Sequence, residues 1–198
     1  MARPTRTPSN QIGPDVLAAA LEILDDEGPD GLTIRALAAR ARVAPMAIYN
    51  HFEGKNGVLE ALWIEGFEQL RLDLSIFTDD PQRDLLDGGR AYRAFALEHR
   101  AHYTVMVMHN FAGFEPSVKA LQVAAQTFYV LVRQIERCQA AGMFRDLRAL
   151  DAAQMLWGTC HGYVSLEILH INFAKDPDGA FIQLLNGLWD GLALGTPT

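Results

Sequence analysis

The ten residues from Val43 to Phe52, VAPMAIYNHF, concentrate polar and aromatic side chains in a segment that is long enough for at most two turns of helix. Tyr49, Asn50 and His51 follow one another there and can all make hydrogen bonds. No carboxylate stands among them to form the acid–base pair that catalysis by proton transfer uses. The segment therefore predicts binding chemistry rather than catalysis.

Glutamate and histidine residues elsewhere raise the alternative of a metal site. Glu98, His99 and His102 fall within one helical turn, and Glu167 and His170 have the i, i+3 spacing of a di-iron helix motif. A di-iron site needs two such motifs and two further glutamates, which are not evident, so cavity-lining or surface histidines are the favoured interpretation. We find no Ser/His/Asp set, phosphate-binding glycine loop or paired carboxylates, and predict no catalytic residue, no metal and no cofactor.

The charge of the chain is distributed unevenly. The 198 residues have a net charge of -7, which argues against a protein that coats nucleic acid with its whole surface. Residues 33–56 nevertheless hold four basic side chains (Arg35, Arg40, Arg42 and Lys55) against one acidic side chain, whereas residues 57–198 hold 11 basic and 17 acidic residues. The sequence therefore predicts a small basic head on an acidic body.

Composition predicts a soluble cytoplasmic protein with a hydrophobic core. The hydrophobic fraction is 49% and the charged fraction 21%, which excludes a disordered chain. No apolar run approaches the length of a membrane helix, and the N-terminal MARPTRTPSNQIGP has no apolar stretch that would make it a secretory signal. We expect Cys138 and Cys160 to be buried thiols.

Helical periodicity runs through the chain, and alternating strand patterns are absent. We predict an all-α fold of about nine helices, in which a three-helix head precedes a helical-bundle body. The head and the start of the body are expected to contain four helices: one from Pro14 to Gly28-Pro29, one capped by Thr33, one from Pro45 to about His51, and one from Lys55 to about Phe77.

The remaining five helices are placed by breaks and caps. One follows Asp79-Asp80-Pro81 and runs to about Arg100, and a short one covers 101–109. Ser117 is expected to cap a helix that ends at Gly142, and Asp151 another that runs to about Ala174. The last helix opens at Asp176-Pro177-Asp178 and runs to about Leu194.

Only Arg42-Val43-Ala44 separates the second helix from the third, which is the spacing of a helix-turn-helix. A helix as short as the third does not form alone in water, so one of its faces must be held by packing. Ala38, Ala41, Val43, Ile48 and Phe52 are the expected packing residues. The other face is then presented to a partner, and in this motif the partner is the major groove of DNA.

Residues 12–62 resemble the DNA-binding domain of the tetracycline-repressor (TetR) family of bacterial regulators. The resemblance is carried by GLTIRALAARARVAPMAIYNHFEGKNGVLEAL, residues 31–62. The positions that agree with the family pattern are Thr33, Ala38, Ala41, Val43, Ile48, Tyr49, His51, Phe52 and Lys55. Four residues depart from it: Arg42 replaces the usual turn glycine, Ala44 the serine cap, Met46 a common glycine, and Gly54 a serine.

Arg42 is therefore expected to adopt a left-handed backbone conformation, at a cost of roughly 1–2 kcal/mol. None of the departures removes a group that DNA binding requires, although they alter base preference.

Residues 150–192 are similar to a C-terminal subgroup of the family named for a Trp-His-Gly signature. The segment LWGTCHGYVSLEI contains Trp157, His161 and Gly162. The resemblance implies that the last two helices form a dimer interface and that the middle helices enclose an effector pocket. We accordingly divide the chain into a DNA-binding domain, 12–56, and an effector-binding and dimerisation domain, 57–198.

The expected DNA-binding residues are Thr33, Arg42, Pro45, Met46, Ala47, Tyr49, Asn50, His51 and Lys55. The resemblance implies that Tyr49 and Lys55 contact DNA phosphates. Lys55 also lies beside a helix N-terminus, where free N–H groups favour anions. Pro45, Met46 and Ala47 suit thymine methyl groups and Asn50 suits adenine. His51 either contacts a phosphate or packs. Arg3 and Arg6 form either a minor-groove arm or a disordered tail.

The expected effector-binding residues are Tyr103, Tyr129, Trp157 and His161, and the methionine and aromatic content of the body favours a small, mostly apolar or aromatic effector. Apolar surface on the last two helices indicates a homodimer. The residues that provide it are Leu166, Leu169, Phe173, Leu184, Leu188 and Trp189, with Gly187 and Gly191 allowing close helix approach.

We therefore expect a homodimeric transcriptional repressor that a small molecule releases from a palindromic operator. An activator is not distinguished by the sequence, nor are the operator, the effector and the regulated pathway. The alternative is an all-α enzyme or metal-binding protein that uses the helix-turn-helix only as a scaffold. The basic head and the lack of a catalytic set argue against it.

Overall fold

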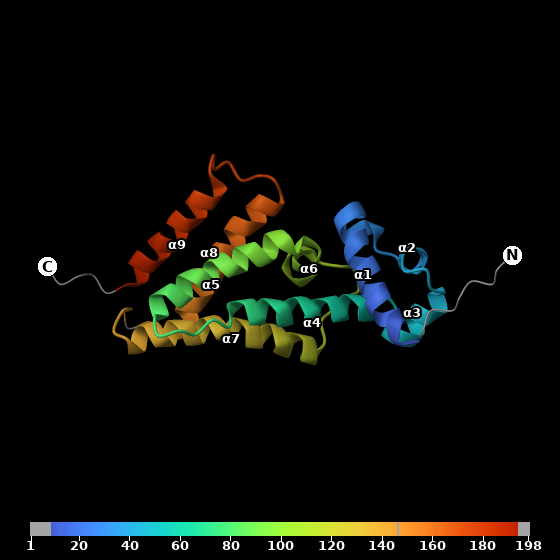
Figure 1. Cartoon of the computed structure of the whole chain (residues 1–198), viewed down its shortest axis with the longest axis horizontal. Helices are drawn as coiled ribbons and strands as arrows, with labels where there is room; N and C mark the ends of the chain where they lie inside the picture. Colours follow the sequence, from blue (N-terminus) through green and yellow to red (C-terminus); the bar gives the residue numbers. More distant parts are fainter. Residues whose placement is uncertain (1–8, 146, 194–198) are drawn as a thin grey trace. The chain divides into compact units, whose positions relative to one another are not determined.

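A computed structural model describes residues 9–145 and 147–193 of the chain (Figure 1). Within these residues there are nine α-helices, and the only β-type pairing is an isolated antiparallel bridge between Phe144 and Ala193. The predicted all-α fold of about nine helices is therefore confirmed. The described chain forms two compact units, residues 9–66 with 100–121, and residues 67–99 with 122–193. No helix in the described part is long and apolar enough to span a membrane.

The first unit is built from short and medium helices. Its elements are α1 (Ser9–Glu27), a 3-10 turn (Pro29–Gly31), α2 (Ile34–Arg40), α3 (Pro45–Phe52), the start of α4 (Lys55–Leu74), α6 (Arg100–Tyr103), a π-helical turn (Thr104–Met108) and the start of α7 (Val118–Ala140). Their limits follow local chemistry. Gly28, at a φ of 73°, ends α1, and the Thr33 hydroxyl accepts a hydrogen bond from the N–H of Ala36 at 3.1 Å, which confirms it as the cap of α2.

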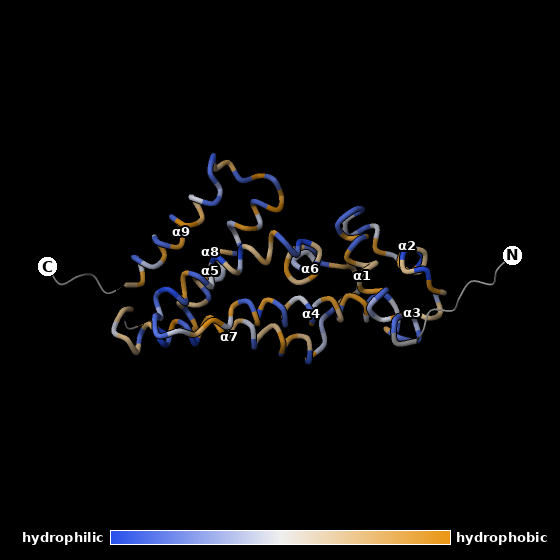
Figure 2. Tube along the Cα trace, in the orientation of Figure 1, coloured by the Kyte–Doolittle hydropathy of each residue, from blue (hydrophilic) through white to orange (hydrophobic). Residues whose placement is uncertain are grey.

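The second unit consists of the remainder of α4 and α7 with α5 (Pro81–Glu98), α8 (Ala149–Ile168) and α9 (Pro177–Leu192). Asp80 and Asp176 cap α5 and α9, each followed by a proline at the first helical position. Along α5, α7 and α9 in Figure 2, polar and apolar residues are interspersed, as expected when one face of a helix is buried. The predicted burial of both thiols is confirmed, because Cys138 is 0% and Cys160 5% exposed.

Three predicted helix limits are wrong. Pro14 lies inside α1 rather than at its start, because the helix extends back to Ser9. Asp151 does not cap α8, which begins at Ala149, and α8 ends at Ile168 instead of continuing to Ala174.

The end of α8 has a clear physical cause. His170 has a φ of 56°, and the N–H groups of His170 and Ile171 donate back to the carbonyls of Glu167 and Leu166, a Schellman motif that closes the helix.

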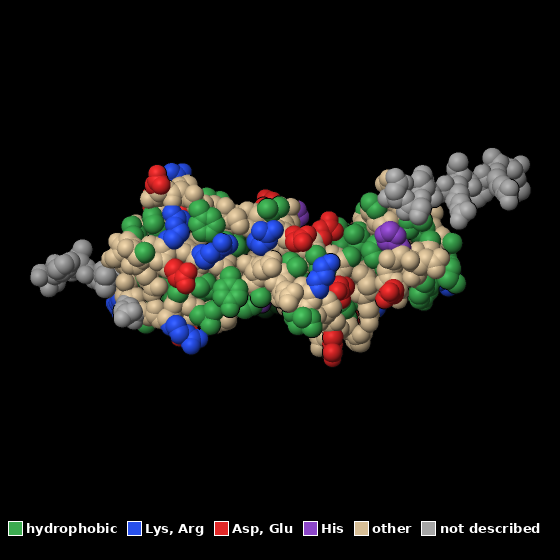
Figure 3. Space-filling view, turned by 90° about the horizontal axis from the view of Figure 1, so that it is seen from below, with side chains coloured by type: hydrophobic (Ala, Val, Ile, Leu, Met, Phe, Trp, Pro, Cys, Tyr) green, Lys and Arg blue, Asp and Glu red, His purple; other side chains and the backbone are tan. Residues whose placement is uncertain are grey.

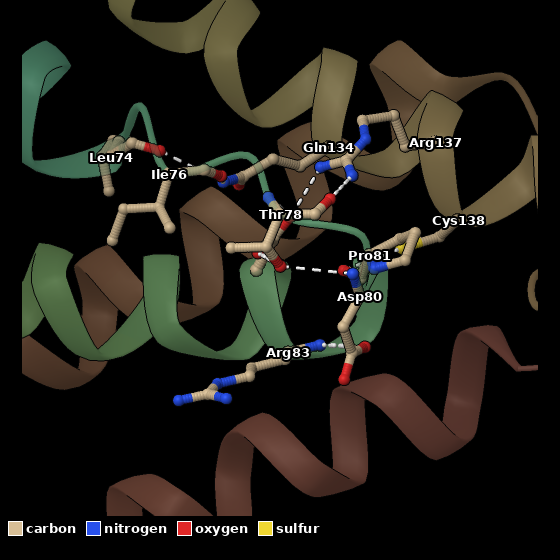
Figure 4. A network of polar contacts seen from close by, with 10 residues as sticks. Leu74, Ile76, Thr78, Asp80, Pro81, Arg83, Gln134, Arg137 and Cys138 are labelled. Carbon is tan, nitrogen blue, oxygen red and sulfur yellow. Dashed lines mark hydrogen bonds and ion pairs between the residues drawn. The ribbon is translucent and has the colours of Figure 1, made fainter.

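The connection between α4 and α5 is fixed by a buried polar cluster in the second unit (Figure 4). Asp84, which is 1% exposed, accepts hydrogen bonds from the N–H and hydroxyl of Thr78, both at 2.7 Å, and from Arg137 on α7 at 2.5 Å. Gln134, one turn earlier on α7, donates to the carbonyl of Leu74 at 3.1 Å. The last turn of α4 and the chain that follows it are therefore tied to α7.

Opposing effects act on the pKa of the Asp84 carboxyl. Burial acts to raise this pKa, but the hydrogen bonds from Thr78 and the guanidinium of Arg137 outweigh burial and hold it below its ordinary value.

Candidate nucleic-acid interface

The turn between α2 and α3 is a Schellman motif closed by an arginine. Arg42 has a φ of 55°, so the expected left-handed conformation is confirmed. Its N–H donates to the carbonyl of Ala39 at 3.3 Å, and the N–H of Val43 donates to the carbonyl of Ala38 at 3.0 Å. The left-handed residue and the Pro45 that begins α3 together set the direction of the third helix.

One face of α3 is buried, as predicted. Ile48 is 0% exposed and Ala38 6% exposed, and both belong to the core of the first unit. Ala41, Val43 and Phe52 are partly buried against the same core. The predicted packing residues of the helix-turn-helix are therefore confirmed, and α3 is held in the way that a helix of its length requires.

The opposite face of α3 is presented to solvent. Met46 is 64% and Tyr49 50% exposed, and Pro45 and Asn50 are exposed as well, whereas Ala47 is half-buried. Adjacent exposed apolar side chains, here Pro45, Met46 and Tyr49 on one short helix, mark a contact surface. In the view of Figure 3, the part formed by α1–α3, at the right, displays apolar side chains and a histidine with few charged groups.

The cations of the first unit are not all available to a partner. Arg40 pairs with Asp26 at 2.9 Å, Glu27 at 2.9 Å and Glu22 at 3.4 Å, all on α1. These carboxylates, of which Asp26 has the largest effect, raise the pKa of the Arg40 guanidinium. Arg40 is therefore held by ion pairs within its own unit. The count of basic residues therefore overstates the charge that the head presents, because the carboxylates of α1 offset Arg40.

The predicted phosphate-binding residues lie on α3 and at the ends of the helices that precede and follow it. Lys55 is the first residue of α4 and is half-buried, and Thr33 and Arg42 are exposed at the two ends of α2. The ring of Tyr49 leans towards the end of α3, where a Cβ on Gly54 would lie 3.4 Å from its Cε1. Hydroxyl, ammonium and guanidinium groups, together with the N-terminus of α4, thus flank the helix.

His51 is exposed, but its ring lies against α1. A Cβ on Gly13 would stand only 2.6 Å from the His51 Nε2, and the His51 and Phe52 rings meet edge to face with centroids 4.7 Å apart. The expected N-terminal arm with Arg3 and Arg6 lies outside the described residues.

Sequence reasoning missed Gly57. A Cβ at this position would overlap the carbonyl oxygen of Phe52, so only glycine lets α4 start this close to the end of α3. The single sequence signal was a glycine inside a helical pattern.

The second unit brings two of the four predicted effector residues together. The rings of Trp157 and His161 stack with centroids 5.7 Å apart, and Phe128 meets Trp157 edge to face at 6.1 Å. The hydroxyl of Tyr92 lies 3.4 Å from His161 Nδ1, and burial lowers the pKa of this imidazole. This group of Tyr92, Phe128, Trp157 and His161 is called the aromatic cluster below.

Tyr103 and Tyr129 are placed differently. Tyr129 contacts Phe128 at a centroid distance of 6.3 Å, but its side chain is 53% exposed. Tyr103 is 1% exposed and belongs to the first unit, so the aromatic cluster does not include it. Sequence reasoning missed Tyr92, because it lies 69 residues from His161 and no local pattern connects the two.

The glutamate of the suspected di-iron motif has another role. Glu167 forms a bidentate pair with Arg93, both distances being 2.7 Å, and Arg93 also reaches Asp178 at 2.6 Å. This network ties α5, α8 and α9 together. Among residues 9–145 and 147–193, no group of three or more histidine, cysteine, aspartate or glutamate side chains is placed to hold a metal ion.

Helices α8 and α9 leave an apolar face open. Leu166 on α8 is 43% exposed, and Leu169 and Phe173, which follow the end of α8 instead of lying on a helix as expected, are 55% and 96% exposed. Leu184, Leu188 and Trp189 on α9 are half-buried, the last two against the core of their own unit. A Cβ added at any of four glycines on these helices would have no atom within 4 Å: Gly158, Gly162, Gly187 and Gly191. The two helices therefore leave room at these glycines for close approach of another helix.

An exposed helix held in a helix-turn-helix defines a class of DNA-binding proteins, and comparisons with known proteins identify the family. Residues 16–62 match the model of "Bacterial regulatory proteins, tetR family", and residues 85–188 match "Tetracyclin repressor-like, C-terminal domain". The chain belongs to the TetR family of bacterial transcriptional regulators.

Individual relatives are similar at modest identity. An uncharacterised HTH-type transcriptional regulator, Rv0681 of Mycobacterium tuberculosis, is 27% identical over 194 residues, which cover 97% of this chain and 84% of the relative. The tetracycline repressor class A from Escherichia coli is 37% identical over 86 residues, 43% of this chain and 40% of that protein.

Solved structures share the fold. A Rhodococcus sp. RHA1 protein of unknown function has a TM-score of 0.83 and 26% identity, covering 98% of this chain and all of that chain. A TetR variant from Acinetobacter baumannii AYE in complex with minocycline has a TM-score of 0.63 and 26% identity, covering 89% and 93% of the two chains.

Proposed function

We propose that the protein is a homodimeric repressor that binds a palindromic operator through α3 and leaves it when a small, mostly apolar or aromatic molecule binds its second unit. The observation that carries the proposal is the exposed face of α3, with Ile48 fully buried behind Met46, Tyr49 and Asn50. In this proposal residues 12–56 bind DNA and residues 57–198 bind the effector and dimerise. The role is binding, in the cytoplasm where the operator lies, and not catalysis.

DNA affinity would come mainly from the groups that flank α3. Lys55 and the free N–H groups at the start of α4 suit one phosphate, and Tyr49, Thr33 and Arg42 suit phosphates on either side. Pro45, Met46, Ala47 and Asn50 would then face base edges. His51 has two proposed roles, since its exposed ring packs on α1 and still carries a free edge for a phosphate.

Dimerisation is proposed through the open face of α8 and α9. Exposed Leu166 and Leu169, with Gly162 and Gly187 free of neighbouring atoms, let two copies of the face approach closely. A two-fold pair of heads would bind two half-sites of a palindrome, as helix-turn-helix dimers do.

The effector is proposed to bind at the aromatic cluster. Trp157 and His161, with Gly162 next to the histidine, are the residues that resemble the Trp-His-Gly subgroup, and Tyr129 is the exposed candidate beside them. The imidazole of His161, kept neutral by burial, offers one polar anchor within an otherwise aromatic surface. Release then requires only that the effector bind better to a conformation that does not fit DNA. The usual coupling between two such sites lowers operator affinity by about 5–150-fold.

The test is selection of DNA by the full-length purified protein from random and genomic fragments. A repressor of this kind recovers a palindrome, and it releases the recovered duplex when a ligand found by a thermal-shift screen is added. Recovery of no common sequence would contradict operator binding. Recovery of a palindrome that no stabilising ligand releases would contradict the effector part alone.

A further inference from the structure

The face that α3 presents contains no cation. None of the eight residues of α3, PMAIYNHF, is Lys or Arg. The commonest specific contact in the major groove is a bidentate pair between an arginine or lysine and guanine, so this helix cannot make it. Base recognition by α3 then depends on apolar contacts and on the polar groups of Tyr49, Asn50 and His51.

Reach and geometry reduce the base-reading side chains to two. Pro45 is exposed, but its ring is closed onto its own backbone nitrogen and extends least from the helix. Tyr49 leans towards Gly54, His51 lies against Gly13, and Ala47 is half-buried with a side chain of a single methyl group. Met46 and Asn50 remain, both exposed and four residues apart on one side of the helix. Met46 is the second residue of α3, and the N-terminal residues of a recognition helix are those that contact base edges.

The spacing of this pair fits the spacing of base pairs. Residues four apart on a helix are separated by about 6 Å along its axis, and stacked base pairs by about 3.4 Å. Met46 and Asn50 therefore reach base pairs about two steps apart when α3 follows the groove. A flexible thioether side chain that is 64% exposed gains most from the one apolar group on a major-groove edge, the methyl group at C5 of a pyrimidine.

We propose that Met46 is a specificity-determining residue that reads the C5-methyl group of a pyrimidine, with Asn50 reading an adenine about two base pairs away. The proposal rests on the proposed function and names the recognition chemistry of that same site. It has a consequence beyond thymine. Because 5-methylcytosine carries its methyl group on the same edge, this position of the operator responds to cytosine methylation.

The test uses the full-length protein and the duplex recovered by selection. Each thymine of the half-site is replaced in turn by deoxyuridine, which removes the methyl group and keeps the hydrogen-bonding edge. At the sensitive position the base pair is then changed to C·G and to 5-methyl-C·G. Wild type is compared with Met46→Ala, with Met46→Leu, which keeps an apolar side chain, and with the control Leu72→Ala, an equally exposed apolar residue of the second unit, 61% against 64%.

Burying one methyl-sized group changes an equilibrium constant about fourfold. The affinity of wild type should therefore fall about fourfold when one half-site carries deoxyuridine and about 15-fold when both half-sites carry it. The 5-methyl-C·G duplex should bind about fourfold better per half-site than C·G. Met46→Ala should show neither difference, and Met46→Leu and Leu72→Ala should show both.

Three results would overturn the proposal. Wild type could be insensitive to every deoxyuridine, or Met46→Ala could retain the full sensitivity of wild type; either result leaves the proposed function standing. Failure of the wild-type protein to select any duplex removes the proposed function and this inference together. Because Met46 is on the surface, an unfolded variant is not expected, and circular dichroism of each variant verifies this.

Discussion

Substitution of Asp84 by alanine should destabilise the protein far more than substitution of its neighbour Asp87. Asp84 is 1% exposed and accepts three short hydrogen bonds, two from Thr78 and one from the guanidinium of Arg137. Asp87 lies one turn further along α5, where its pairs with Arg83 and Arg90 are on the surface. The two carboxylates therefore form a matched comparison on one helix.

The expected loss follows from burial. Breaking a buried ion pair by removing one partner costs about 3–5 kcal/mol. The lower end applies here, because the Arg137 side chain is 31% exposed and water can hydrate its guanidinium. We predict a loss of about 3 kcal/mol in the free energy of unfolding for Asp84→Ala. Surface pairs contribute about 0–1 kcal/mol, which is the loss predicted for Asp87→Ala.

The assay is urea unfolding at pH 7 at one fixed protein concentration, since dimerisation makes stability depend on concentration. A loss for Asp84→Ala no larger than that for Asp87→Ala would refute the reasoning. The pH dependence gives a second check. Because the pKa of Asp84 is lowered in the folded protein, its stabilisation is present above the unfolded value of about 4 and disappears as pH falls further, so wild type and Asp84→Ala should converge only in acid.

Three further predictions concern the proposed function. Lys55→Ala should flatten the dependence of log K for operator binding on log salt by about two units, one for each subunit of the dimer, whereas Arg83→Ala in the second unit should leave the slope unchanged; an unchanged slope for Lys55→Ala would mean that it contacts no phosphate. Gly162→Leu should leave the subunit folded, because nothing lies within 4 Å of its Cβ, but should weaken the dimer in sedimentation equilibrium, and an unaffected dimer would place the interface elsewhere. Trp157→Ala should alter the response to a ligand from the thermal-shift screen while effector-free operator binding stays nearly intact; the reverse pattern in a folded dimer would make Trp157 a core residue.

Local sequence information predicted the helix-turn-helix well. The cap at Thr33 and the buried Ile48 follow from capping and periodicity rules, which act over a few residues. The left-handed Arg42 was expected from the resemblance, because it stands where the family usually has a turn glycine. The end of α8 was missed because His170 takes the left-handed position that glycine usually marks.

Long-range polar pairs were not predictable from the sequence. Arg93 and Glu167 are separated by 74 residues and Asp84 and Arg137 by 53, and no local pattern assigns these partners. The charge count of the head failed for the same reason, because the pairing of Arg40 with Asp26 depends on how α1 and α2 pack.

The central claim, that the protein is an operator-binding dimer, is tested most directly by the stoichiometry and affinity of its complex with the selected duplex. Sedimentation of wild-type protein with that duplex, and with a duplex in which one half-site is scrambled, measures both. The account predicts two 21.9 kDa chains on the palindrome and much weaker binding to the scrambled duplex. Equal affinity for both duplexes, or a single chain on the palindrome, would contradict it.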